Sequence, residues 1–208
     1  SFVLPKKKPI TYKVSSNETE TSKVLNKKDF DKAKEVIKFI KSKKWNSALK
    51  LTEKIKDKEF RNLITWMYLK TTRNGASFNE YKKFIEQNSD YPRINRIRYL
   101  AEEKIYLRNN SPTSIINWFE KYPPLGGMGK IKLAEAYLEQ GKFDYVKELV
   151  KEGWITASIR KNDLGYYRAK FKKFIDAEDH IKRADYLAWE RKYWDLKRML
   201  KYLPKDQR

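Results

Sequence analysis

The chain has 208 residues, of which 48 are Lys or Arg and 27 are Asp or Glu, so its formal net charge is +21. A hydrophobic share of 40% and an aromatic share of 14% exclude a wholly disordered protein. With no Cys and a single His, the sequence excludes a disulfide framework, a thiolate metal site, a Cys nucleophile and a His-based zinc site.

The positive charge raises the question of nucleic-acid binding. Lys outnumbers Arg by 36 to 12, and acidic residues are interleaved with the basic ones along the whole chain. Proteins that read nucleic acids use Arg for bidentate contacts and gather their charge on one face. The sequence therefore disfavours specific nucleic-acid binding, and a general attraction to anionic polymers is the expected consequence of the charge.

Residues 1–28 predict an extended arm or linker, because they lack a helical period, contain two Pro and are rich in Ser, Thr and Lys. The chain begins with Ser, so we expect that an upstream segment has been removed. No window approaches the roughly 18 apolar residues of a membrane span, so we expect none.

From Asp29 onward, apolar residues recur at spacings of three and four, which predicts helices, and no segment alternates as a strand would. The domain 29–208 is therefore predicted to be an all-α superhelix, or α-solenoid, of helical hairpins with about ten helices. The predicted segments are 29–42, 44–55, 57–71, 78–88, 92–109, 112–121, 129–140, 142–152, 162–174, 176–190 and 191–202.

Start signals support several of these segments. Ser77 and Glu80 have the spacing of a capping box. Pro92 and the pair Ser111–Pro112 are each expected to open a helix, because Pro is tolerated in the first turn. The loop PPLGGMG at 123–129 is expected to interrupt the helices on either side.

A weak internal repeat relates KWNSALKL at 44–51, GKFDYVKEL at 141–149 and KYWDLKRM at 192–199. In each copy an aromatic residue starts a helix, and apolar residues follow three and six positions later. These aromatics, which are Trp45, Phe143 and Tyr193, are predicted to be wedges in the core. The alternative is an aromatic ladder that binds a ligand.

The only histidine, His180, lies in DHIKRADYLAW at 179–189 beside charged residues, as a catalytic residue might. A packing role is favoured, because neither a nucleophile nor further metal ligands lie near it in the sequence. Asp176 and Asp179 are predicted to cap this helix, and Asp179 to pair with Arg183 at i,i+4.

Three carboxylates elsewhere are candidates for a catalytic acid. Glu102, Glu103 and Glu135 are predicted to be solvated helix residues or i,i+4 partners, as in the pair Arg98–Glu102. No catalytic, cofactor-binding or metal-binding residue is assigned in this chain.

Several stretches, in collinear order over roughly residues 30–208, resemble the N-terminal superhelical region of the soluble lytic transglycosylases, bacterial enzymes that cleave peptidoglycan glycan strands. The stretches are ITWMYLK (64–70), GASFNEYKKFIEQNSDYP (75–92), IRYLAEEKI (97–105), IINWFEKYPPLGGMGKIKLAEAYLEQGK (115–142), VKEGW (150–154), DHIKRADYLAW (179–189) and KRMLKYL (197–203). The chain departs from the family at Tyr91, where the family usually has Trp, and at Gly126, where it usually has Thr.

The resemblance implies a non-catalytic region that positions glycan strands for a lysozyme-like domain downstream, in the periplasm, without a cofactor. The family's catalytic acid is a Glu followed by Ser, with a Gly-Leu-Met-Gln segment shortly after, and this chain contains neither. The expected partners are the glycan strands and that catalytic domain, and we expect the chain to be an excised N-terminal region. The alternative functions are a helical-repeat scaffold that binds proteins or peptides and, less favoured, a nucleic-acid-binding protein.

Overall fold

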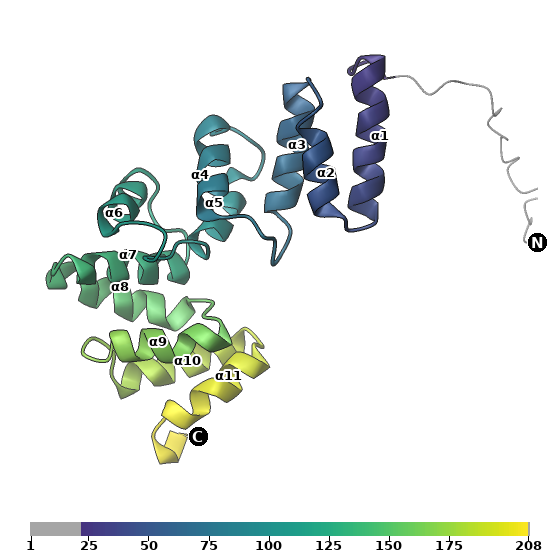
Figure 1. Ribbon diagram of the computed structural model, residues 1–208. Coiled ribbons are helices and arrows are strands. Elements are labelled where there is room, and N and C mark those ends of the chain that lie inside the picture. The colour runs from purple at the N-terminus through teal and green to yellow at the C-terminus, as the bar shows by residue number, and fades with distance from the viewer. Residues whose placement is uncertain (1–21, 208) are drawn as a thin grey trace, which may run out of the picture. The chain divides into compact units, whose positions relative to one another are not determined.

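A computed structural model describes residues 22–207, so most of the predicted arm over 1–28 lies outside the described residues. Within residues 22–207 the chain is all-α, as predicted, and contains no strand. None of the helices in that range has both the length and the apolar character that a membrane crossing requires. The described helices are α1 (Lys27–Lys41), α2 (Trp45–Thr52), α3 (Lys58–Leu69), α4 (Phe78–Gln87), α5 (Ile94–Glu102), α6 (Pro112–Lys121), α7 (Gly127–Glu139), α8 (Phe143–Thr156), α9 (Lys161–Lys170), α10 (Ala177–Trp189), α11 (Tyr193–Met199) and the 3-10 turns η1 (Leu200–Tyr202) and η2 (Lys205–Gln207) (Figure 1).

The chain divides into two compact units between Ile64 and Thr65, inside α3. In the first unit α1 and α2 form a helical hairpin. Its start is fixed by Asp29, a buried residue whose carboxylate accepts hydrogen bonds from the backbone N–H groups of Lys56 (3.0 Å) and Asp57 (3.3 Å). Asp29 thereby ties the first turn of α1 to the loop that precedes α3.

In the second unit each helix packs mainly against helices that are near it in the sequence. The packed pairs are α4 with α5, α5 with α7, α6 with α7, α7 with α8, α8 with α10, and α10 with α11. Such a succession of local contacts is characteristic of stacked helical hairpins. The superhelical path that we expect from the sequence remains a prediction.

Helix α7 lies at the centre of the second unit, between two apolar clusters. Leu133 and Ala136 belong to the cluster of α4, α5 and α6, whereas Ile131 and Ala134 belong to the cluster of α8 to α11. Because α7 is covered on both sides, the sequence GMGKIKLAEAYLE carries small and apolar residues around most of its circumference.

The start signals at Ser77 and Ser111 are confirmed. Ser77 and Glu80 form the predicted capping box of α4, and the Ser111 side chain accepts a hydrogen bond from the N–H of Ser114. The prediction for 92–109 is wrong at both ends, since α5 covers only Ile94–Glu102. Arg93, with a φ of 57°, cannot continue a right-handed helix back to Pro92.

A tightened last turn explains why α5 ends at Glu102 and does not continue to residue 109. The N–H groups of Lys104 and Ile105 bond to the carbonyls three residues earlier, which tightens the last turn and ends the helix. Ile105 is then completely buried beyond the helix end. The apolar spacing that suggested a helix as far as residue 109 therefore belongs to a buried turn.

The internal repeat corresponds to a helix–turn–helix that recurs three times, at α1–α2, α7–α8 and α10–α11. Each turn contains one residue in the left-handed region, namely Lys43 (φ 57°), Gly141 (φ 70°) and Arg191 (φ 55°). In each turn the N–H of the following Lys bonds to the carbonyl five residues earlier, which is the Schellman pattern; the bonds are Lys44 to Phe39 (2.9 Å), Lys142 to Tyr137 (3.0 Å) and Lys192 to Leu187 (2.8 Å).

The prediction that the repeat aromatics are core wedges is wrong for two of them. The exposed fractions are 58% for Phe143 and 62% for Tyr193. These residues occupy the first position of α8 and α11, immediately after the turn, and the residue three positions later faces inward instead, as completely buried Val146 shows.

Two Gly→Ala substitutions test the turn geometry. Gly141 has a φ of 70° and nothing within 4 Å of an added Cβ, so Gly141→Ala should lower the free energy of unfolding by about 1–2 kcal/mol through backbone strain alone. Gly165 lies inside α9, also with open space around an added Cβ, so Gly165→Ala should raise it by about 1 kcal/mol. Urea unfolding followed by circular dichroism measures both, and a change of the same sign in the two variants would contradict the assignment of this turn.

Candidate functional site

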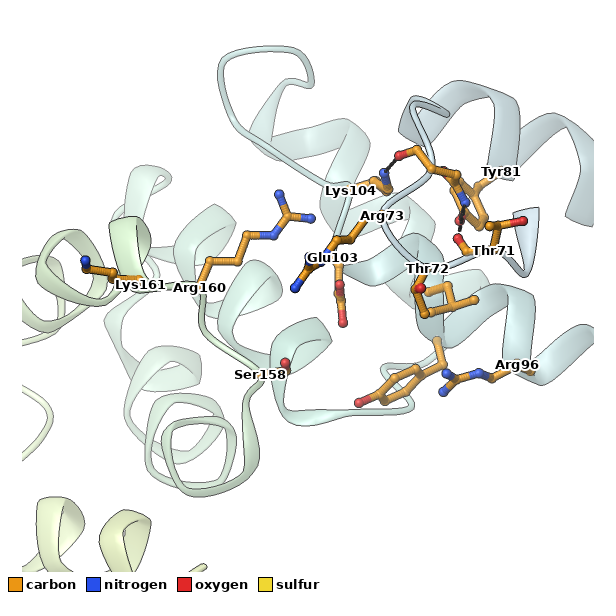
Figure 2. Close-up of a pocket in the computed structure, with 13 residues that line it drawn as sticks. Thr71, Thr72, Arg73, Tyr81, Arg96, Glu103, Lys104, Ser158, Arg160 and Lys161 are labelled. Carbon is orange, nitrogen blue, oxygen red and sulfur yellow. Dashed lines mark hydrogen bonds between the residues drawn. The ribbon is translucent and has the colours of Figure 1, made fainter. Parts of the chain in front are cut away.

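The second unit contains a pocket with a volume of about 770 Å³, which is lined by the α3–α4 loop, α4, α5 and the two residues after it, the α8–α9 loop and the start of α9. Five of its side chains are positively charged and one, Glu103, is negatively charged. Figure 2 shows Arg73 and Arg160 extending toward the centre of the pocket from different segments, whereas Lys161 points away from it. The lining residues are Thr71, Thr72, Arg73, Asn74, Tyr81, Arg96, Tyr99, Leu100, Glu103, Lys104, Ser158, Arg160 and Lys161.

The loop that carries Arg73 is fixed by its neighbour Asn74. The Asn74 side-chain amide donates to the carbonyls of Leu69 (3.1 Å) and Thr71 (2.9 Å) and to the Tyr81 hydroxyl (2.7 Å). The Tyr81 hydroxyl in turn donates to the Leu69 carbonyl (2.7 Å). Because these groups hold the loop from within, Arg73 is presented in one backbone conformation, with a φ of 58°.

Ser158 and Arg160 form the opposite side of the pocket. Arg183 of α10 holds the backbone directly before them. The Arg183 guanidinium is 2% exposed and donates to the carbonyls of Trp154 (2.5 Å) and Ala157 (3.0 Å). Arg183 thus satisfies the last carbonyls of α8, where the chain turns toward Arg160. The predicted ion pair of Asp179 with Arg183 is wrong, since Asp179 instead pairs with Lys151 at 3.1 Å.

Two of the positive charges in the pocket have no ion-pair partner in the described part of the chain. Among the described residues, neither Arg73 nor Arg160 forms a salt bridge. The pKa of Lys104 is lowered, first by burial and then by the positive charge of Arg160, while Glu103 acts in the opposite direction. The Lys104 ammonium also donates to the Asn74 carbonyl (2.7 Å), which links α5 to the Arg73 loop.

A narrow cleft adjoins the pocket and shares Glu103, Ser158 and Arg160 with it. Lys132 of α7 also lines the cleft and is 1% exposed. The Lys132 ammonium donates to the Tyr167 hydroxyl (2.6 Å) and lies 3.9 Å from the centre of the Tyr106 ring. Burial lowers the pKa of Lys132 to about 8.

Glu102, which the sequence analysis interpreted as solvated or paired with Arg98, is instead 3% exposed. Its two carboxyl oxygens accept hydrogen bonds from the N–H groups of Leu125 (2.5 Å) and Gly126 (3.0 Å), directly before α7. A Cβ on Gly129 would lie 2.5 Å from the Glu102 carboxyl carbon, so this approach requires Gly. The carboxyl group therefore caps α7, and Arg98 donates to the Pro123 carbonyl (3.1 Å).

Glu135 is also buried rather than solvated, with an exposed fraction of 3%. It accepts a hydrogen bond from the Tyr166 hydroxyl and forms a salt bridge of 3.2 Å with Lys170. Glu103 is the one member of the three carboxylates that faces the pocket. The two buried carboxylates thus serve to hold α7 against α5 and α9.

His180 contacts the core through its ring. The indole N–H of the completely buried Trp154 donates to His180 Nδ1 (3.2 Å), and the two rings meet edge to face. Burial lowers the pKa of His180, with a further contribution from Arg168. The capping of α10 by Asp176 and Asp179 is confirmed, and the two side chains do so as a capping box. His180 is thereby engaged in joining α8 to α10.

A comparison of the chain with protein-family models, with curated proteins and with solved structures found no match in any of the three. Residues 22–207 also contain no group of three or more His, Cys, Asp or Glu side chains placed to hold a metal ion. The function must therefore be argued from the contacts above.

Sequence reasoning missed the pocket because its charged residues come from three segments that are far apart in the chain. Arg73, Arg96 and Arg160 are a quarter of the 12 Arg residues, and they are separated from one another by 23 and 64 positions in the sequence. Each of the α3–α4 and α8–α9 loops contains a single Arg, so the sequence alone offers no signal for this pocket.

The pH dependence of stability tests the role of Glu102. Burial raises the pKa of Glu102 to about 7 from its ordinary value of 4.5, although backbone N–H groups act to lower it. Between these two pH values the folded protein retains a proton that the unfolded chain releases. The free energy of unfolding should therefore fall, by roughly 3 kcal/mol, as the pH rises through this window.

In urea titrations at pH 4.5 to 8, Glu102→Gln should lack this component of the fall, and the neighbouring control Glu103→Gln should retain it. An identical pH profile for the wild type and Glu102→Gln would contradict the role assigned to Glu102.

A second pair of variants separates His180 from Arg183. His180→Gln should cost less than ~1.5 kcal/mol, because a Gln oxygen can accept the Trp154 N–H. Arg183→Met should cost about 2 kcal/mol or more, because it removes the guanidinium donor of the buried Trp154 carbonyl and one of the two donors of the Ala157 carbonyl. Thermal unfolding measures both, and a His180→Gln cost equal to that of Arg183→Met would show that the interpretation of His180 is wrong.

Proposed function

We propose that this chain is the non-catalytic superhelical region of a soluble lytic transglycosylase, which holds peptidoglycan glycan strands in the periplasm for a lysozyme-like domain. The observation that carries the proposal is that the stretches resembling this family contact one another in the second unit. They form the core of one scaffold, which supports a common origin for them.

The first of these contacts joins the stretch at 97–105 to the stretch at 115–142. Glu102 of the former accepts hydrogen bonds from Leu125 and Gly126 of the latter. The second contact joins VKEGW at 150–154 to DHIKRADYLAW at 179–189, through the bonds of Trp154 with His180 and Arg183. Residues that specify a fold in this way are those that a shared scaffold would retain.

The charge of the chain agrees with such a substrate. Peptidoglycan carries carboxylates on its stem peptides, and a surface with a net charge of +21 attracts anionic polymers. The basic pocket gives this attraction a defined location in the second unit.

The buried Glu102 is not suited to the family's acid catalysis, despite a pKa of about 7. Glu102 is only 3% exposed and both of its oxygens lie against the backbone directly before α7, so its proton cannot reach a glycosidic oxygen. In this proposal, bond cleavage belongs to the downstream domain.

A second candidate function is a helical-repeat scaffold that binds proteins or peptides. The observation that favours it is a group of exposed aromatic side chains at the α10–α11 turn, since exposed apolar surface commonly marks interaction sites. The exposed fractions are 85% for Trp189, 62% for Tyr193 and 68% for Trp194.

Co-sedimentation with purified peptidoglycan sacculi tests the proposed function. The pure chain should pellet with sacculi at low salt, should bind less as salt screens its charge, and should release no anhydro-muropeptides. An active lytic transglycosylase is the positive control for release of anhydro-muropeptides. Failure to pellet at low salt would contradict the proposal, and release of anhydro-muropeptides by the pure chain would contradict the non-catalytic assignment.

A further inference from the structure

The basic pocket combines features of a built ligand site. Its volume of about 770 Å³ lies within the range of clefts that take small-molecule ligands, and it is much larger than a single ion requires. The backbone on both sides is held in place, by Asn74 next to Arg73 and by Arg183 at the start of the Ser158–Arg160 segment. Pre-positioned groups lose little entropy when a ligand binds.

The charges in the pocket define the ligand's chemistry. Arg73 and Arg160 extend into the pocket without a salt bridge to any described residue, and guanidinium groups suit bidentate binding of carboxylate or phosphate (Figure 2). Lys104 lies close enough to Arg160 for its pKa to be lowered by that charge. An anionic group that enters here would relieve this repulsion.

Glu103 further restricts the class of ligand that the pocket can bind. It lines both the pocket and the cleft that adjoins it, among the cations. A ligand with a charged phosphate at every backbone unit and no backbone N–H group, such as a nucleic-acid strand, would be repelled by this carboxylate. A ligand that carries carboxylates and also an ammonium or amide N–H group could donate to it. The neutral polar groups of Thr71, Thr72 and Ser158 suit the backbone amides of such a ligand.

We propose that this pocket binds a short acidic peptide or glycopeptide, with Arg73 and Arg160 on its carboxylates and Glu103 on an ammonium or amide N–H group. The identification of the physiological ligand as the peptide portion of peptidoglycan rests on the proposed function. The ligand class itself rests only on the pocket.

Fluorescence anisotropy on the 208-residue chain tests this proposal. The probes are a labelled disaccharide-tetrapeptide from digested peptidoglycan, the same compound with its carboxyl groups amidated, and a labelled tetraglutamate peptide. Wild type should bind the first and third probes, and amidation should weaken binding at least tenfold.

Two double variants with the same net charge, each lower than that of the wild type by two, separate the pocket from the overall charge. Arg73→Gln with Arg160→Gln should weaken binding of both acidic probes at least tenfold. Lys172→Gln with Lys173→Gln removes two exposed charges outside the pocket and should change binding less than twofold. Circular dichroism and thermal unfolding verify that both double variants fold. Glu103→Gln should weaken binding of the disaccharide-tetrapeptide probe. It should not weaken binding of inorganic phosphate, measured by its competition with the probe for the arginines.

Several results would overturn the proposal. Equal weakening by the two double variants would indicate attraction by net charge alone, and tighter binding of random DNA or structured RNA at the same pocket would indicate a nucleic-acid site. If the Arg73→Gln, Arg160→Gln variant still binds sacculi in full, the pocket is not the site that binds peptidoglycan, and the proposed function stands. Conversely, if tetraglutamate binds in a pocket-dependent way but sacculi do not bind, the proposed function is wrong, and the assignment of the pocket as an acidic-peptide site stands.

Discussion

The second unit depends on the capping of α7 by Glu102. The first N–H groups of a helix lack partners within the helix, and the Gly129 N–H in the first turn of α7 is directed at the buried Glu102 carboxyl group, where a lost hydrogen bond is costly. Glu102 supplies acceptors for Leu125 and Gly126 and thereby fixes the end of α5 against the start of α7. Because α7 packs on α5, α6 and α8, its position sets those of its neighbours.

The geometry of the pocket follows from this arrangement. The side chains of Arg96, Tyr99 and Glu103 lie on α5 or directly after it, so the capping contact also positions one wall. The start of α7 meets the other wall, since a Cβ on Gly127 would lie only 2.4 Å from the Ala157 backbone nitrogen. Arg183 then holds the same segment from α10. Two buried polar side chains, Glu102 and Arg183, thus place the two charged walls of the pocket.

The helices could largely be predicted from the sequence, because their apolar spacing and caps are local signals. Ser77, Ser111 and Asp176 act as caps where the sequence placed them. The roles of Glu102 and Arg183 could not be predicted in this way. An i,i+4 partner is visible in the sequence, whereas their actual partners are backbone groups 23 to 29 residues away.

The exposed aromatics show a second limit of the sequence pattern. A helix that starts with an aromatic residue looks amphipathic from its spacing, but the turn before Phe143 and Tyr193 rotates that first residue outward. The turn geometry therefore decides burial at these positions, more than hydrophobicity does. The pocket is also invisible in the sequence pattern, because its cations come from distant segments. Arg73 and Lys161 are 88 positions apart in the chain but line one cavity.

The most direct measurement of the capping of α7 by Glu102 is an NMR titration of its carboxyl carbon. We expect this carbon to titrate with a pKa near 7, and the amide protons of Leu125 and Gly126 to shift with the same midpoint, since they donate to that carboxyl group. Titration of Glu102 near its ordinary value of 4.5, with amide protons of Leu125 and Gly126 that do not respond, would contradict the account.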